Sequence, residues 1–149
     1  MIRYSHTQRS PLLPPLAVVV VTVIGAVAFL SGGGVEVAAV VLVAGSLIAL
    51  VGLTMSRLTV DVADDHLRLA FGAGWPSKRI EFVDIASARA VRNRWWYGWG
   101  IRLTPVGLVW NVWGLDAVEF ELASGRRFRI GTDEPRALLA ALSGMVAIS

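Results

Sequence analysis

Two long apolar stretches lie near the start of the chain, at residues 12–30 and 37–55, and neither contains a charged side chain. Only the sequence SGGGVE separates them. The second stretch gives about 28 Å of helix, close to the thickness of a bilayer's hydrocarbon core. Pro14 and Pro15 interrupt the first stretch, but proline is tolerated in the first turn of a helix. The pattern therefore predicts a transmembrane hairpin with spans at residues 14–30 and 37–55.

Two alternatives compete with this hairpin. A pair of buried helices in a soluble protein would have the same composition, but the rest of the chain is too small to cover two helices that are apolar all round. A cleaved signal peptide is the other alternative, because Arg3 and Arg9 form a basic start and residues 26–28 (AVA) resemble a small-x-small cleavage site. The apolar run continues past that site and a second span follows at once, which favours the uncleaved hairpin.

From Arg57 onward, apolar and polar residues alternate with the period of two that is typical of β-strands. The alternating segments are residues 58–62, 67–71, 79–82, 85–91, 101–103, 108–110, 117–122 and 127–130. The third and fourth of these form either one bent strand or two short ones. Turn residues separate the segments, as at Ser124 and Gly125. We therefore expect about seven short antiparallel strands.

The period changes once more near the C-terminus. Leu138 and Leu142 lie one helical turn apart, Pro135 fits the first turn, and Gly144 stands where a helix often ends. Residues 136–142 are therefore predicted as a short amphipathic helix. The predicted fold is a two-helix transmembrane hairpin followed by a mainly-β domain, in which a curled sheet or partly open barrel is capped by this C-terminal α-helix.

Positive charges flank the predicted spans on the side away from their connection. Arg3 and Arg9 precede the first span, Arg57 and Arg68 follow the second, and the connection carries only Glu36. The positive-inside bias therefore places both termini in the cytoplasm.

This arrangement divides the chain into three parts. Residues 1–11 are expected to form a cytoplasmic tail, residues 12–55 the transmembrane hairpin, and residues 56–149 a cytoplasmic domain. The chain has no cysteine, which agrees with a reducing compartment because there is no disulfide framework to form.

The charge balance argues against a nucleic-acid partner. Of the chain's 14 Lys and Arg residues only Arg3 and Arg9 precede the spans, and of its 11 acidic residues only Glu36 lies outside the predicted domain. The domain is therefore close to neutral, although the whole chain carries a net charge of +3.

Motifs for catalysis or cofactor binding are absent from the sequence. There is no cysteine nucleophile and no serine in a nucleophile elbow. Residues 64–66 (DDH) are adjacent on one turn and cannot all converge on a metal ion. Residues 72–74 (GAG) lack the third glycine and the Lys-Ser/Thr pair of a phosphate loop. We therefore expect no catalytic, cofactor-binding or metal-binding residues, and a protein that is not an enzyme.

Residues 57–143 resemble the bacterial pleckstrin-homology-like domains of small membrane proteins. The resemblance rests on the order of strands followed by one helix, on GWGIR at residues 98–102, and on RFRIGTDEP at residues 127–135 followed by Leu139 and Leu142. Many members of this family carry two preceding spans, so the resemblance implies a multi-pass protein of the bacterial inner membrane. It implies little about activity.

Eukaryotic relatives that bind phosphoinositides use basic residues on the first two strands and on the loop between them. The corresponding predicted loop in this chain holds Asp64, Asp65 and His66, with Arg68 alone beyond it. This departure argues against inositol-phosphate binding by that route.

A patch of arginine and aromatic residues is the strongest candidate for an interaction surface: Arg92, Arg94, Trp95, Trp96 and Tyr97. Consecutive tryptophans on a strand or loop point opposite ways, so both cannot enter one core. The patch fits a membrane-facing lip, because indole rings and arginines favour the headgroup region of an anionic leaflet. It also fits a protein-binding hot spot, which is typically rich in Trp and Arg.

Nearby tryptophans are expected to behave differently. Trp99 and Trp110 are predicted to fill the core, since small barrels are filled by large side chains.

These features lead to a functional hypothesis. We expect a non-catalytic integral membrane protein whose domain acts in protein–protein or membrane-surface contact, in a scaffold or assembly role. Its partners would be membrane lipid, including the anionic leaflet, and another membrane protein or a second copy of itself. The alternative is an accessory subunit of a transporter or cell-envelope enzyme complex.

Overall fold

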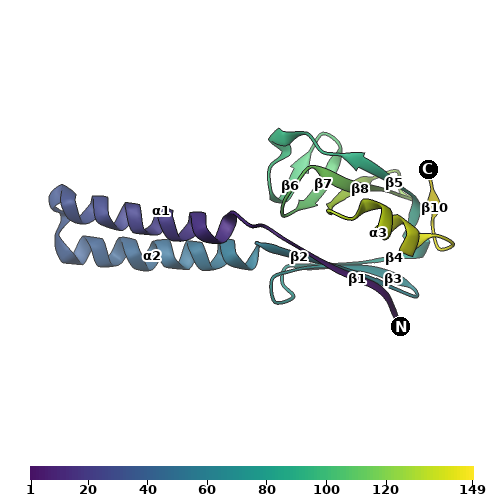
Figure 1. Ribbon diagram of the computed structural model, residues 1–149. Helices are drawn as coiled ribbons and strands as arrows, with labels where there is room; N and C mark the ends of the chain where they lie inside the picture. The colour runs from purple at the N-terminus through teal and green to yellow at the C-terminus, as the bar shows by residue number, and fades with distance from the viewer. The chain divides into compact units, whose positions relative to one another are not determined.

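A pair of helices is inserted into a β-rich part of the chain (Figure 1). The structure is a computed structural model that describes residues 1–32 and 34–149; of Gly33 only the backbone is described. The chain divides into a helical unit, Ser10–Ser56, and a β unit that combines Met1–Arg9 with Arg57–Ser149. The two are described separately below.

The helical unit is an antiparallel hairpin. Its elements are α1 (Leu13–Ala28) and α2 (Gly34–Thr54), joined through the segment η1 (Phe29–Gly33), in which the chain turns at Gly32 with a non-helical φ of 83°. Gly25 of α1 is buried against Leu42 of α2, while most other apolar side chains of both helices are exposed. The stretches Leu13–Gly32 and Gly34–Thr54 are long and apolar enough to cross a membrane. The predicted helical hairpin is confirmed, and its apolar outer surface is compatible with membrane insertion.

The β unit contains two sheets. Sheet A has the order β1 (Ile2–Arg9), β2 (Arg57–Ala63), β3 (His66–Phe71) and β4 (Ser77–Glu81). Sheet B has the order β10 (Ala147–Ile148), β5 (Ile85–Arg92), β8 (Asp116–Leu122), β9 (Arg127–Gly131), β7 (Gly107–Asn111) and β6 (Gly100–Thr104). All neighbouring pairs are antiparallel except β5–β10 and β7–β9. Neither sheet closes into a barrel within the described residues.

The N-terminal segment is a strand, not the tail expected from the sequence. Strand β1 pairs along its length with β2, ending at the pair Arg9–Arg57. The side chains that β1 turns inward are polar or amphipathic, namely Tyr4, His6 and Gln8, so the segment shows no hydrophobic alternation. Its partner strand follows only after the helices. The helical unit therefore takes the place of the turn between two neighbouring strands.

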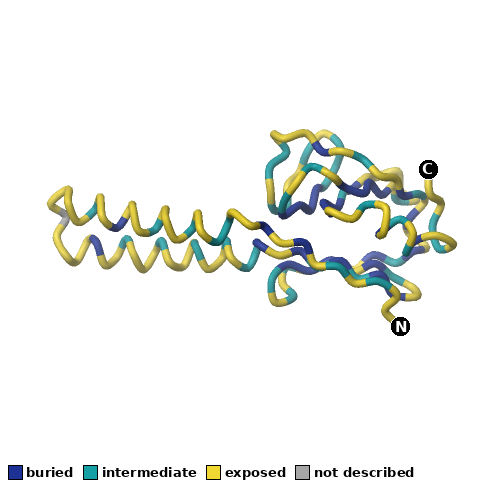
Figure 2. Tube along the Cα trace, in the orientation of Figure 1, coloured by how far each residue is buried: buried dark blue, intermediate teal, exposed yellow. Residues whose placement is uncertain are grey.

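The core lies between the two sheets, where buried segments face each other in Figure 2. Phe71 of sheet A stacks on Trp110 of sheet B with ring centroids 5.5 Å apart. Helix α3 (Pro135–Leu142) contacts β1 in sheet A and β5 and β8 in sheet B. It fully buries Leu138 and Leu142, each worth about 1.5–3 kcal/mol relative to exposure. The predicted C-terminal helix is confirmed.

The predicted strands correspond to β2 through β9. The segment expected as one bent strand or two is two strands, because the short 3-10 helix Phe82–Asp84 separates β4 from β5. Strand β1 and the two-residue β10 are additional to the predicted set; together with the divided segment they give ten strands instead of about seven.

Candidate interaction surface

The segment between β5 and β6 carries the predicted interaction residues and is fixed at both ends. At its start, the buried Asn93 donates from its backbone N–H to the carbonyl oxygen of Leu115 at 2.6 Å. At its end, Nδ2 of Asn111 donates to the carbonyl oxygens of Gly98, at 3.5 Å, and Gly114, at 3.1 Å. Gly98 has a φ of 69°, a left-handed conformation that lets the chain turn toward β6 without strain. The residues between these anchors project outward.

Arg94 and the three aromatic rings of this segment form a contiguous surface, and the exposed Arg92, the last residue of β5, precedes it in the chain. We call Arg92, Arg94, Trp95, Trp96 and Tyr97 the 92–97 surface. The side chains of Trp95 and Trp96 are 77% and 56% exposed. Their rings meet edge to face with centroids 5.8 Å apart, and Trp96 meets Tyr97 in the same way at 6.3 Å. The guanidinium carbon of Arg94 lies 5.0 Å from the centroid of the Trp96 ring.

The local backbone differs from the one expected. Residues Trp95–Tyr97 form a 3-10 helix, so Trp95 and Trp96 do not alternate across a strand and both are exposed. The sequence predicts that Trp95 and Trp96 cannot both enter one core, and the structure agrees. Both side chains are exposed because they lie on a helical turn, not because they alternate across a strand.

Two neighbouring tryptophans test the predicted core. Trp110 is buried, as expected. Trp99 was predicted in the core but is 47% exposed. It stacks on Trp113 with ring centroids 5.3 Å apart and an interplanar angle of 15°. Trp113 lies in the loop before β8 and covers one face of the Trp99 ring, which leaves the rest of the ring exposed.

An ion triad around the buried Glu119 connects the anchored segment to sheet B. Glu119 of β8 is only 2% exposed and lies opposite Arg89 of β5 and Arg129 of β9. Nε of Arg89 donates to it at 3.0 Å, and Nε of Arg129 at 2.7 Å. Arg129 also donates from Nη1 to Oδ1 of Asn93 at 3.3 Å. Burial alone would raise the pKa of Glu119, but the hydrogen bonds and charges of the two arginines outweigh it and hold the pKa below its usual value.

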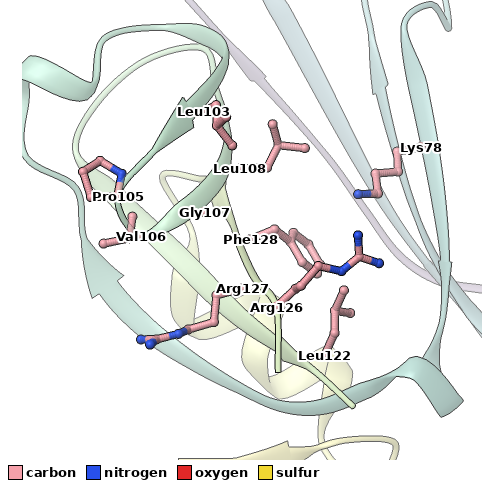
Figure 3. A pocket seen from close by; sticks show the side chains of 10 residues that line it. All are labelled: Lys78, Leu103, Pro105, Val106, Gly107, Leu108, Leu122, Arg126, Arg127 and Phe128. Carbon is pink, nitrogen blue, oxygen red and sulfur yellow. The ribbon is translucent and has the colours of Figure 1, made fainter. Parts of the chain in front are cut away.

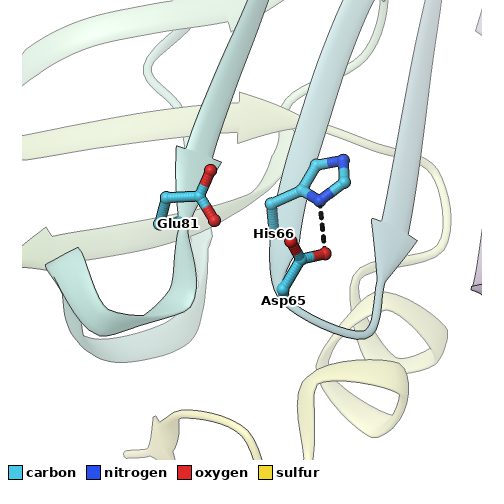
Figure 4. A group of neighbouring side chains, drawn as sticks. All are labelled: Asp65, His66 and Glu81. Carbon is cyan, nitrogen blue, oxygen red and sulfur yellow. Dashed lines mark hydrogen bonds and ion pairs between the residues drawn. The ribbon is translucent and has the colours of Figure 1, made fainter.

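A second charged cluster lies on sheet A, at the turn between β2 and β3. Ligand atoms of Asp65, His66 and Glu81 lie within 4.8 Å of one another (Figure 4). Glu81 comes from β4, where it pairs with His66 in register, a proximity that reading residues 64–66 alone did not reveal. Asp64 instead accepts a hydrogen bond from Nε of Arg3 at 2.6 Å.

This cluster already contains a cation. Nη2 of Arg79 lies 3.0 Å from Oδ2 of Asp65, and its Nε donates to Oε1 of Glu81 at 2.8 Å. The contact with His66, followed by the charges of His66 and Arg79, lowers the pKa of Asp65. A metal ion would have to displace the guanidinium from both carboxylates, so the arrangement fits an exposed ion-pair network better than a metal centre.

No protein-family model matches this chain, and no curated protein matches it. The fold defines its class: two helices long and apolar enough to span a membrane, inserted into a two-sheet β unit that carries the α-helix α3 near its C-terminal end.

Proposed function

We propose that this protein is a non-catalytic, membrane-anchored interaction module. Helices α1 and α2 hold it in a bacterial plasma membrane, and its β unit, of pleckstrin-homology-like type, binds another membrane protein or a second copy of the chain. The proposed contact is the 92–97 surface. The order of strands followed by one closing helix supports the type of the β unit, and the flanking arginines support a cytoplasmic position.

The exposed pair Trp95 and Trp96 is the observation that carries this proposal. A single exposed apolar side chain is normal, but a contiguous exposed aromatic patch marks an interaction site, and Trp with Arg is the composition typical of interface hot spots. The edge-to-face contacts and the position of Arg94 over Trp96 restrict the rings before any partner binds. A preorganised surface loses less side-chain entropy on binding.

A protein partner fits this surface better than an anionic leaflet does. Binding to a leaflet gains about 1 kcal/mol for each cation near the headgroups, and this surface has only two cations, Arg92 and Arg94, beside its three adjoining aromatic rings. Membrane lipid remains the proposed environment of α1 and α2.

Phosphoinositide binding in the manner of eukaryotic relatives receives no support. The loop that the resemblance puts in the place of their basic loop is residues 64–66, between β2 and β3. Asp64 accepts a hydrogen bond from Arg3 and Asp65 accepts one from Arg79, so this loop offers carboxylates where those relatives have basic residues.

A second candidate function, accessory subunit of a larger membrane complex, has one observation in its favour. An apolar groove of about 300 Å³ runs between α1 and α2, and Gly45, Ala49 and Gly52 contribute to its wall. Small residues allow close approach of another transmembrane helix.

The proposal is tested by placing a photo-crosslinking benzoylphenylalanine at Trp95 of the full chain in native membranes. The matched control is the same residue at Trp75, which is 79% exposed outside the 92–97 surface. We expect a discrete protein adduct from position 95 and none from position 75. Trp95→Ala with Trp96→Ala should lower co-purification of that adduct partner at least about tenfold, since hot-spot residues each contribute about 2 kcal/mol or more. Adducts to lipid alone, or unchanged co-purification by the double variant, would contradict the proposal.

A further inference from the structure

The β unit contains a cavity of about 670 Å³ that shares no residue with the 92–97 surface. Figure 3 shows side chains converging on it from β4 of sheet A and from several strands of sheet B. The residues used in the argument below are Lys78, Leu108, Leu122, Arg126 and Phe128.

One wall of the cavity is apolar and fixed. The ring of Phe128 is buried and stacks on Phe120 with centroids 4.8 Å apart. Leu108 and Leu122 continue this wall. Gly107, which also lines the cavity, has a φ of 108°, and a Cβ there would collide with the carbonyl oxygen of Arg127. This close approach of β7 to β9 holds the wall in place.

Two cations face the space above this wall. Nζ of Lys78 lies 5.5 Å from the centroid of the Phe128 ring. Figure 3 shows the ammonium of Lys78 and the guanidinium of Arg126 directed into the cavity from opposite elements. A neighbouring cavity of about 290 Å³ shares both residues and has Asp84 on its wall.

Neither cation has an acidic partner among the described residues: no carboxylate lies within 4.0 Å of either. Among the described residues, the side chain of Arg126 makes a single long hydrogen bond, 3.4 Å from its Nε to Oγ of Ser124. Burial, and then the charge of Arg126, lower the pKa of Lys78. Two like charges that face one apolar cavity without a counter-ion repel each other, and a bound anion would relieve that repulsion.

We propose that this cavity binds an amphipathic anion, with one phosphate or carboxylate group between Lys78 and Arg126 and an alkyl chain against Phe128, Leu108 and Leu122. The charge of the cations and the apolar wall beside them together define this ligand class. The site is separate from the 92–97 surface, so it makes the β unit a receptor for a lipid-like small molecule in addition to the proposed protein contact.

The test uses the full chain in nanodiscs of neutral phosphatidylcholine, titrated with hexyl phosphate by calorimetry, with empty nanodiscs subtracted. Lys78→Gln and Arg126→Gln should each weaken binding about tenfold, as expected for loss of a charge-assisted hydrogen bond. Arg136→Gln is the matched control, because Arg136 is exposed on α3 outside the cavity. It should leave binding unchanged.

Two further probes separate the parts of the ligand. Inorganic phosphate and hexyl glucoside should each bind at least about tenfold more weakly than hexyl phosphate, because each lacks one of the two required features. The proposal would be overturned if either probe bound as tightly as hexyl phosphate. It would also be overturned if the Lys78→Gln and Arg126→Gln double variant bound hexyl phosphate as tightly as the wild type, or if a hexaglutamate peptide bound more tightly than hexyl phosphate. Circular dichroism of each variant is the check that it is folded. None of these outcomes depends on the partner of the 92–97 surface.

Discussion

Nε of Arg129 donates a hydrogen bond to Oε2 of Glu119 at 2.7 Å, across the neighbouring strands β9 and β8. Arg129 is 11% exposed in its side chain and Glu119 is 2% exposed. Removing one partner of such a pair leaves the other charge buried without compensation, which costs far more than the pair itself contributes.

Glu119→Gln should therefore lower the free energy of unfolding by about 3 kcal/mol at pH 7, at the low end for a buried pair because Arg89 is half exposed. Glu121→Gln, on the same strand but exposed, should change it by less than about 0.5 kcal/mol. Denaturant unfolding of the full chain, followed by tryptophan fluorescence, measures both. Equal effects of the two substitutions would contradict a structural role for the triad.

The same carboxylate should make stability depend on pH. The pKa of Glu119 is lower in the folded state than its ordinary value of 4.5. Its contribution is therefore present above that value and is lost as the pH falls through the folded-state pKa. The difference in unfolding free energy between the wild type and Glu119→Gln should shrink as the pH is lowered below about 4.5. A difference that stays constant from pH 7 to pH 3 would show that Glu119 stabilises the fold through packing alone.

The features predicted from the sequence are those with a local periodic signal. The two apolar helices follow from charge-free runs of membrane length, and β2 through β9 follow from alternation. Strand β1 has no such signal, since Tyr4, His6 and Gln8 occupy its inward positions. It is recognised only through its pairing with β2 on the far side of the helices.

The chemistry of the β unit was harder to predict because it depends on register. Glu119 lies on a face that alternation marks as polar and exposed, yet two arginines from neighbouring strands bury it. Trp99 is not in the core because it stacks on Trp113, a residue of a loop whose position the sequence pattern does not predict. The 92–97 surface was predicted as a cluster, since its members are consecutive in the chain, whereas Lys78 and Arg126 are distant in sequence and meet only in the fold.

Packing of the helical hairpin depends on Gly25. A Cβ there would lie 2.5 Å from Cδ2 of Leu42, whereas a Cβ at Gly52 would have no heavy atom within 4 Å. Gly25→Val should therefore displace the end of the Leu42 side chain and disturb the helix packing, at a cost of about 1 kcal/mol, the low end for overpacking, and Gly52→Val should not. A Cβ at Gly45 lies 3.8 Å from that of Val21, which suits a disulfide.

The short distance between positions 21 and 45 allows the packing of α1 against α2 to be measured by disulfide formation. Cysteines at Val21 and Gly45 should form a disulfide on mild oxidation, since the chain has no other cysteine. Gly25→Val should reduce the extent of that reaction, with Gly52→Val as the matched control. Failure of the pair to oxidise in the otherwise unaltered chain would contradict the antiparallel packing of α1 and α2.

The sidedness proposed for the β unit can be tested with single cysteines in intact cells. Val35, beside the turn between the helices, is 73% exposed, and Ser77 and Ser124 are exposed on the β unit. A membrane-impermeant maleimide should label Val35→Cys in intact cells, and Ser77→Cys and Ser124→Cys only after lysis, because the flanking arginines favour a cytoplasmic position. Labelling of the two β-unit positions in intact cells would reverse the orientation. The 92–97 surface would then face the cell exterior, and its partner would have to be sought there.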